Sequence, residues 1–173
     1  MFLGELWNVD EENGLRSGVS EQRSAALLVV VPFFVVWGLD SFLFHVTDFF
    51  VVFVPVAVRL VLAAVALGFA LLFLQLSHGM IYGRVRDSPQ VLNMGVYGRV
   101  RHPMYLGTLL IYVGFILATF SLLSFAVWAG ILLLYDRMAT YEERDLIRLL
   151  GDDYRDYQKS VPKWLPRIIP IHK

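Results

Sequence analysis

The hydrophobic positions of the chain fall into three long runs separated by polar stretches, rather than into the short alternating patterns of a soluble fold. The runs cover residues 25–44, 49–76 and 104–138. A helix needs about 20 mostly apolar residues to cross a bilayer. The pattern therefore predicts an all-α, polytopic integral membrane protein.

The second run is longer than one span requires and contains Arg59. A charge at the centre of a bilayer costs at least ~2.5–3.5 kcal/mol. We therefore expect the span to begin near Val56, after Pro55, with Arg59 reaching the headgroups. The alternative places Arg59 in a polar cavity. Residues 49–54 would lie at the interface, unless they form a fifth crossing.

The third run is too long for one span and just long enough for two short ones. Thr119, Phe120 and Ser121 form its most polar interruption, so we predict a tight helical hairpin of residues 104–118 and 122–138. This gives four transmembrane helices, or five if residues 49–54 also cross. The polar tail begins as an amphipathic helix, which Gly151 ends or kinks.

Composition agrees with a membrane protein, since 57% of the residues are hydrophobic, 17% are charged and the mean hydropathy is +0.60. The formal net charge is zero, which argues against a nucleic-acid partner. Cysteine is absent, which excludes disulfides, thiolate metal sites and a cysteine nucleophile. We expect no metal site, and the polar, acidic first residues predict no cleavable signal peptide.

The arginines predict an orientation in the membrane. The loop of residues 77–102 carries four arginines against one acid, whereas residues 38–57 hold no lysine or arginine. The positive-inside rule places the arginine loop, and with it both termini, in the cytoplasm. We expect a cytoplasmic arm (1–24), two spans (25–76) and a core of loop, hairpin and C-terminal lid (77–173).

The chemistry-bearing residues gather in the stretch 95–107 and at Glu142 and Glu143, which lie before and after the hairpin. Each group alone is an ordinary membrane anchor or helix-dipole partner. A hairpin, however, brings its two ends together in space. Pro103 suits the start of a helix, and Gly107 leaves room for close backbone approach. The two groups together would form a small polar cup able to hold a compact zwitterion.

Two motifs give this cup a resemblance. Residues 95–107 read Gly-Val-Tyr-(x)3-Arg-His-Pro-x-Tyr-x-Gly, and residues 142–166 read Glu-Glu-(x)7-Gly-(x)2-Tyr-(x)2-Tyr-(x)3-Val-Pro-(x)2-Leu-Pro. With the hairpin between them, they resemble the catalytic core of the isoprenylcysteine carboxyl methyltransferase family, which is related to the membrane phospholipid N-methyltransferases. The match covers residues 91–168.

The resemblance implies S-adenosylmethionine-dependent methyl transfer to a lipophilic acceptor that enters from the bilayer. Glu142 would bind the amino group of the cofactor, because a carboxylate pairs with an ammonium by a charge-assisted hydrogen bond. A tyrosine face can lie against the sulfonium. The positions that the resemblance assigns to the cofactor are Gln90, Val91, Leu92, Tyr97, His102, Pro103, Met104, Tyr105, Glu142 and Glu143.

The acceptor stays open at this point. The resemblance favours O-methylation of a prenylcysteine-like carboxylate, with Arg101 and His102 as catalytic residues and Arg101 and Arg137 as the substrate clamp. Met138, however, stands where the eukaryotic enzymes carry a substrate-binding arginine. The alternatives are a membrane-soluble thiol, a lipid amine, or a non-catalytic membrane scaffold that keeps the fold. The oligomeric state is not predicted.

Overall fold

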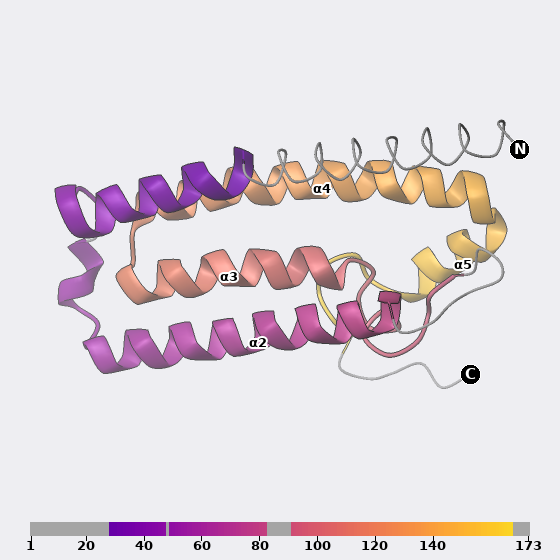
Figure 1. Ribbon diagram of the computed structural model, residues 1–173, viewed down its shortest axis with the longest axis horizontal. Coiled ribbons are helices and arrows are strands. Elements are labelled where there is room, and N and C mark those ends of the chain that lie inside the picture. The colour runs from indigo at the N-terminus through magenta and orange to yellow at the C-terminus, as the bar shows by residue number, and fades with distance from the viewer. Residues whose placement is uncertain (1–27, 48, 83–90, 168–173) are drawn as a thin grey trace, which may run out of the picture.

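The computed structural model describes residues 28–47, 49–82 and 91–167, which form an elongated bundle of helices (Figure 1). The predicted arm of residues 1–24 and the candidate residue Gln90 lie outside the described residues. The described part holds helices and turns but no strand, as the all-α prediction requires. In chain order the elements are the helix Leu28–Phe44, with its π-helical end η1 (Leu39–Phe44), then η2 (Phe49–Val52), α2 (Val56–Tyr82), α3 (Pro103–Thr119), α4 (Leu122–Leu150) and α5 (Asp152–Ser160).

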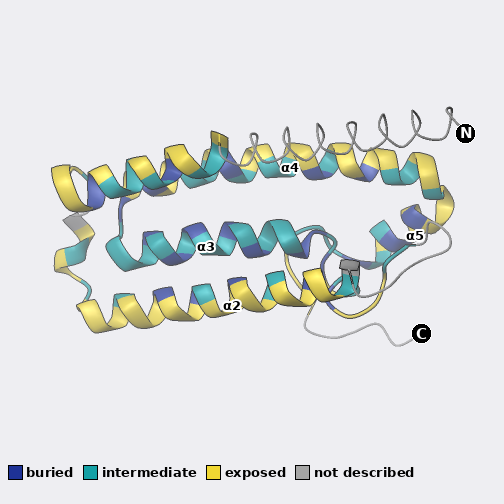
Figure 2. Ribbon diagram, in the orientation of Figure 1, coloured by how far each residue is buried: buried dark blue, intermediate teal, exposed yellow. Residues whose placement is uncertain are grey.

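Two helices, Val56–Met80 within α2 and Leu122–Leu150, are long and apolar enough to cross a membrane. Leu28–Phe44 and α3 are shorter apolar helices, so a total of four spans stays a prediction. At 1.5 Å per residue, α4 is about 43 Å long and extends beyond a hydrocarbon core of about 30 Å. Exposed residues make up much of α2 (Figure 2).

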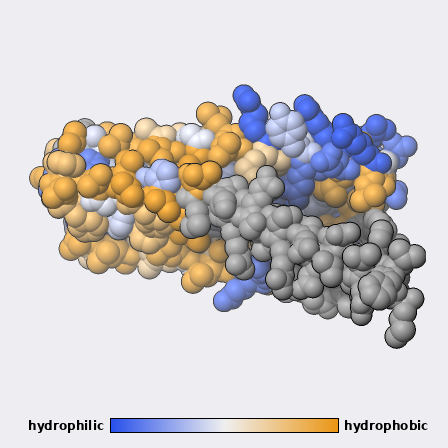
Figure 3. All heavy atoms as spheres, turned by 45° about the horizontal axis from the view of Figure 1, so that its top comes forward, coloured by the Kyte–Doolittle hydropathy of each residue, from blue (hydrophilic) through white to orange (hydrophobic). Residues whose placement is uncertain are grey.

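Apolar and hydrophilic side chains lie at different ends of the visible surface (Figure 3). Apolar side chains cover most of the half away from α5, and hydrophilic ones gather at the end that carries α5. A lipid-facing apolar surface with one polar end is the distribution expected of a protein whose functional groups lie at a membrane surface. The buried core includes Phe33, Leu109, Tyr112 and Ile131, which join the first helix to α3 and α4.

The second span begins at Val56, as predicted from Pro55. The segment before it, η2, has four residues. At about 2 Å per residue this segment is about 8 Å long and cannot form a fifth crossing. The Nη1 of Arg59 donates a hydrogen bond to the carbonyl oxygen of Ala118 at 3.2 Å. Neither sequence interpretation of Arg59 included this partner. A cation at the C-terminal end of α3 also interacts favourably with the helix dipole.

Small residues bring α2 and α3 together along their length. A Cβ added to Gly107 would lie 2.9 Å from the Leu74 Cγ and 3.1 Å from the Ala70 carbonyl oxygen. One added to Gly114 would lie 2.7 Å from the Leu67 Cγ. Small residues at an interface let the backbones of membrane helices approach closely. The close approach predicted at Gly107 is therefore confirmed, and it fixes the start of α3 against α2.

The predicted turn of the hairpin is also confirmed, since α3 ends at Thr119 and α4 begins at Leu122. Phe120 ends α3 in the left-handed conformation, with φ of 52°. Ser121 then caps α4, because its hydroxyl oxygen accepts a hydrogen bond from the Ser124 backbone N–H at 3.1 Å. The second helix of the hairpin does not end at residue 138, as predicted, but continues unbroken to Leu150. Glu142 and Glu143 therefore lie within α4.

Buried polar groups join the first helix to this turn. The Asp40 carboxylate accepts the backbone N–H groups of Val46 and Thr47, each at 3.1 Å, and the hydroxyls of Thr47 and Ser121. Thr47 in turn accepts the Leu123 N–H at 2.9 Å. We call Asp40, Thr47, Ser121 and Ser124 the turn cluster. It closes the end of the bundle opposite α5.

Candidate active site

The two ends of the hairpin meet, as predicted, and His102 joins them. Pro103 is the first residue of α3 and His102 precedes it, so the imidazole stands at the entrance to the hairpin. Its Nε2 lies 2.9 Å from the Glu143 Oε1, and its Nδ1 lies 3.7 Å from the Glu142 Oε2. One imidazole therefore faces both glutamates of α4, across 40 residues of sequence.

Glu143 is buried, with 7% of its surface exposed, and both of its carboxylate oxygens have partners. Oε1 accepts from His102 and lies 3.2 Å from the Arg101 Nε. The Arg101 contact is an ion pair rather than an aligned hydrogen bond. Oε2 accepts a hydrogen bond from the Gln158 side-chain amide at 2.9 Å. Glu143 thus ties α3, α4 and α5 together at one point.

Glu142 is placed differently, although it is the adjacent residue. Its side chain is 51% exposed. The Tyr105 hydroxyl lies within hydrogen-bonding reach of its carboxylate, and the His102 Nδ1 is at 3.7 Å. Protein groups therefore leave much of this carboxylate accessible, which suits a carboxylate that binds a cationic ligand.

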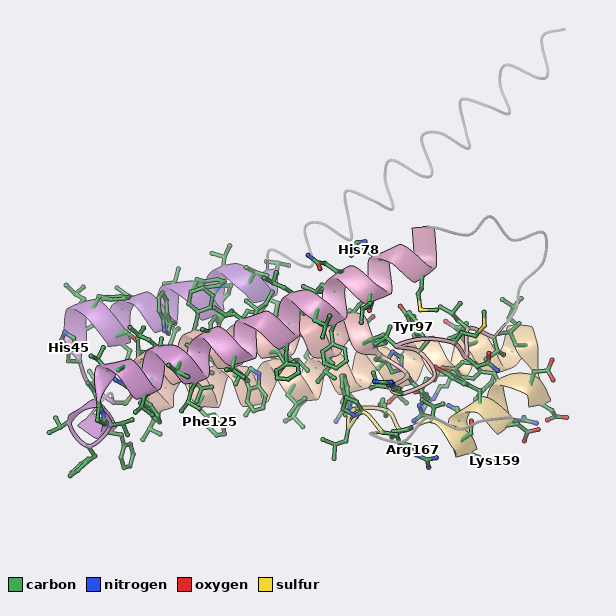
Figure 4. All side chains as sticks on the ribbon, turned by 90° about the horizontal axis from the view of Figure 1, so that it is seen from below. His45, His78, Tyr97, Phe125, Lys159 and Arg167 are labelled. Carbon is green, nitrogen blue, oxygen red and sulfur yellow. The ribbon has the colours of Figure 1, made fainter. Side chains whose placement is uncertain are left out.

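A C-terminal strap, residues 161–167, runs from α5 back across the site. Gly151 separates α4 from α5 with φ of 60°, a conformation that favours glycine, as its predicted role as a helix end requires. The Arg101 N–H donates to the Pro162 carbonyl and the Arg167 N–H donates to the Arg99 carbonyl, each at 3.0 Å. Figure 4 shows Tyr97, Lys159 and Arg167 at this end of the bundle and His45 at the other.

The strap is also fixed to α4 by side chains. The Lys163 ammonium donates to the Asp136 carboxylate at 2.6 Å and to the Thr140 hydroxyl at 2.8 Å. The Trp164 indole N–H donates to the same Asp136 carboxylate at 2.9 Å. The Trp164 ring centroid then lies 6.1 Å from that of His102. The sequence interpretation missed this contact, because Asp136 and Trp164 lie 28 residues apart.

An aromatic series leads from His102 into the helix pair. The His102 and Tyr105 rings stack with centroids 5.6 Å apart and planes 8° apart. The Tyr105 and Tyr135 centroids are 5.3 Å apart, with planes tilted by 41°. Tyr135 was also missed. The signal that could have found it is spacing, since it precedes Glu142 by seven residues, or two helical turns.

Burial raises the pKa of the three tyrosines that surround the loop and α5. For Tyr97 burial outweighs the opposing hydrogen bond from Ser77, and the charge of Glu142 adds to the rise. For Tyr154 the charge of Glu143 adds to burial, and for Tyr157 the neighbouring Tyr154 does so. All three are neutral phenols at physiological pH. Tyr157 uses its hydroxyl to donate to the Tyr97 carbonyl at 2.7 Å.

The remaining predicted residues are divided between the site and its surroundings. Pro103 is buried at the start of α3 and Met104 follows it, partly buried. Val91 packs on the cluster formed by Tyr154, Tyr157 and Val161, and Leu92 is partly buried beside it in the chain. All of these lie in the part of the fold that the two motifs predicted. Their contact with a cofactor stays a prediction.

Arg137 is the predicted residue that the structure does not bring to the site. It is exposed, whereas Ala139 is buried. Two residues of an α-helix correspond to about 200° of rotation, so Arg137 points away from the face that carries Ala139 and Glu143. Arg101 does reach the site but pairs with Glu143. Among the described residues, no group of three or more His, Asp or Glu side chains could hold a metal ion.

Comparison with known proteins agrees with this architecture. The phospholipid methyltransferase family profile matches residues 54–153, which is more than half of the chain. Among individual proteins, the chain is similar to a methanethiol S-methyltransferase of Pseudomonas deceptionensis, with 38% identity over 42% of the chain and 27% of the relative. A methanethiol S-methyltransferase of Mycobacterium tuberculosis is 40% identical over 41% of the chain and 28% of the relative.

A third relative is the protein-S-isoprenylcysteine O-methyltransferase of Schizosaccharomyces pombe, 34% identical over 53% of the chain and 39% of the relative. The chain therefore matches well under half the length of each of these proteins. No solved structure matches it. These matches confirm the resemblance to isoprenylcysteine methyltransferases. The chain belongs to the phospholipid methyltransferase family, among the members that resemble isoprenylcysteine methyltransferases.

Proposed function

We propose that the protein is an integral-membrane methyltransferase that uses S-adenosylmethionine and acts on a lipophilic acceptor. The observation that carries this proposal is the difference between two adjacent carboxylates. Glu143 is buried and fully partnered, whereas Glu142 is half exposed at the entrance to the same hairpin. The family and the names of the relatives support methyl transfer as the reaction.

The residues present suit the cofactor. Glu142 would hold its ammonium group by a charge-assisted hydrogen bond, and Tyr97 and Tyr105 supply aromatic surface close to that carboxylate. When bound, the cofactor supplies a methyl group that its sulfonium already activates. The task of the protein is then to align the acceptor and to exclude water. The strap, fixed at Asp136, is placed to contribute to the second of these.

His102 acts in this proposal as a positioning residue. One ring nitrogen contacts Glu143 and the other faces Glu142. Nε2 is held by Glu143, whereas Nδ1 lies 3.7 Å from Glu142, too far for a hydrogen bond, so His102 mainly orients Glu143 at the start of α3. An acceptor that is already ionised at neutral pH needs no base, and a carboxylate meets that condition. This supports a prenylcysteine-like carboxylate as the first acceptor to test.

A hydrophobic thiol is the second candidate, and two observations favour it. Five of the similar proteins are named methanethiol S-methyltransferases. In addition, Arg137 faces away from the site and Arg101 is paired with Glu143, so neither predicted arginine is free to clamp a carboxylate. A thiol with the pKa of a cysteine side chain, near 8.5, is partly thiolate at neutral pH without a base.

Cofactor binding tests the proposal first. Calorimetry on the detergent-purified full chain should show binding of S-adenosylmethionine and of S-adenosylhomocysteine. Glu142→Ala should weaken both by about 10-fold to 100-fold, the cost of one hydrogen bond to a charged group. Asp145→Ala is the matched control, because Asp145 is an exposed acid one turn further along α4. Absence of binding to the wild-type protein at millimolar ligand would exclude the proposed function.

Transfer of a labelled methyl group then identifies the acceptor. The panel needs a farnesylated cysteine analogue with a free carboxylate and a hydrophobic thiol of similar size. A product that mild base hydrolyses is a carboxyl ester, whereas a thioether is stable to base. Label in the ester would support the prenylcysteine-like carboxylate, and label in the thioether would support the thiol.

A further inference from the structure

Tyr135 is an aromatic residue near the site that lies outside both motifs. It lies seven residues before Glu142 on α4, which places both on the same face of the helix, two turns or about 10 Å apart. Asp136 and Thr140 lie between Tyr135 and Glu142 along α4, on the adjacent face of the helix. Both accept hydrogen bonds from Lys163 of the strap. Tyr135 and Glu142 thus lie on the neighbouring face of α4, and the Trp164 ring of the strap packs on the same core cluster as Tyr135.

Two aromatic rings, one from α3 and one from α4, meet on the face that carries Tyr135 and Glu142. The Tyr105 ring of α3 lies 5.3 Å from the Tyr135 ring of α4, and the planes are tilted by 41°. Tyr105 is itself fixed, because its ring stacks on His102. Its hydroxyl reaches toward Glu142. Tyr105 thus connects the exposed carboxylate with the Tyr135 ring.

The direction along α4 gives this arrangement a chemical meaning. Tyr135 lies nearer than Glu142 to the apolar part of the helix, where an acceptor from the bilayer would arrive. A short carbon chain separates the ammonium of S-adenosylmethionine from its sulfonium. If Glu142 holds the ammonium and the methyl group is turned toward the apolar part of α4, the sulfonium would lie on the Tyr135 side of Glu142. An aromatic face attracts such a cation.

We propose that Tyr135, together with Tyr105, forms the aromatic wall that binds the sulfonium end of the cofactor and directs its methyl group toward the bilayer. This inference rests on the proposed function and deepens it. It assigns a binding role to a residue outside both motifs. It also separates two tasks on α4: Glu142 recognises the ammonium that both forms of the cofactor carry, and Tyr135 recognises the charge that only the methylated form carries.

The test compares two ligands that differ in that charge. S-adenosylmethionine has a sulfonium, whereas S-adenosylhomocysteine has a neutral thioether. Calorimetry on the full chain in detergent should show that Tyr135→Leu lowers the affinity for S-adenosylmethionine by roughly 5-fold to 30-fold. This is the effect expected from the loss of a desolvated cation–π contact. Binding of S-adenosylhomocysteine should change by less than about 2-fold. Tyr135→Phe keeps the ring and should keep both affinities.

Two further variants protect the interpretation. Tyr135→Met keeps an apolar side chain of similar length without a ring. It replaces Tyr135→Leu if the Leu variant folds poorly, and the same loss of S-adenosylmethionine affinity is expected. Tyr141→Leu is the matched control, because Tyr141 is an exposed tyrosine on the same helix, and neither affinity should change. Equal weakening of both ligands in Tyr135→Leu and Tyr135→Met, or no weakening of either, would overturn the inference. The proposed function fails separately, if the wild-type protein binds neither ligand.

Discussion

The bundle has a buried carboxylate at each end, and the two ends differ in what surrounds it. At the turn, Asp40 is 2% exposed and accepts four hydrogen bonds from Val46, Thr47 and Ser121. At the site, Glu143 is 7% exposed and contacts His102, Arg101 and Gln158. Each carboxylate joins segments that are distant in sequence. The site also has a second carboxylate, Glu142, which the protein leaves half exposed.

Burial and the number of protein partners distinguish the structural acids from the acid that is available to a ligand. A carboxylate that loses its water must gain protein partners for all of its oxygens. Asp40 and Glu143 meet that requirement and hold the fold together. Glu142 has kept much of its solvent, so a ligand can replace that solvent at little cost.

The largest effect is expected for Glu143→Ala. It leaves the Arg101 guanidinium without its counter-charge in a site where the two side chains are only 13% and 10% exposed. Breaking a buried ion pair costs about 3–5 kcal/mol. We expect a large fall in the thermal unfolding temperature in detergent, and faster proteolysis of α5 and the strap.

Glu142→Ala provides the comparison at the adjacent position. The side chain is half exposed, so its removal should change the free energy of unfolding by less than about 1 kcal/mol. The two variants should thus differ strongly in stability, and Glu142→Ala should lose cofactor affinity while it stays folded. Equal destabilisation by the two substitutions would show that the structural and ligand-binding roles are not divided in this way.

The second effect in size concerns the turn cluster. Asp40→Ala removes the acceptor of two backbone N–H groups and two hydroxyls and should cost about 2–3 kcal/mol. Because the cluster is at the opposite end of the bundle, cofactor affinity measured below the unfolding temperature should stay within about 2-fold of wild type. A loss of affinity would show that the two ends are coupled.

Much of the fold followed from the sequence, because membrane helices obey simple rules of length and polarity. Pro55 predicted the start of α2 at Val56, and the polar Thr119 and Ser121 predicted the turn of the hairpin. The hairpin in turn predicted that His102 would meet the two glutamates. These features depend on local pattern and on one topological fact, that the ends of a hairpin lie together.

The other features depend on contacts that no local pattern specifies. Arg137 was predicted as a clamp because it lies beside Met138, where the eukaryotic enzymes carry a substrate-binding arginine, but its place on the helix turns it away. The division between Glu142 and Glu143 depends on Gln158 and Arg101. Asp136 lies outside both motifs, yet it fixes the strap through Lys163 and Trp164. Such roles need the tertiary structure.

A third, smaller effect tests the packing that positions the start of α3. Gly107→Ala places a Cβ 2.9 Å from Leu74 and 3.1 Å from the Ala70 carbonyl. Overpacking of this kind typically costs about 1–3 kcal/mol. Gly130→Ala is the matched control, since nothing lies within 4 Å of its added Cβ. That control should be neutral or stabilise α4 slightly. Equal unfolding temperatures for the two variants would contradict the close contact of α2 and α3.

The smallest effect is expected on the outer face of α5. Lys159 and Asp156 form an ion pair at 2.8 Å, but their side chains are 76% and 74% exposed. Exposed pairs contribute little, because water and salt screen both charges. Lys159→Ala should therefore leave both the unfolding temperature and cofactor affinity close to wild type. A clear loss in either would mean that an ion pair in solvent matters as much as the buried contacts of Glu143, and burial would then not be what divides structural from functional charges in this protein.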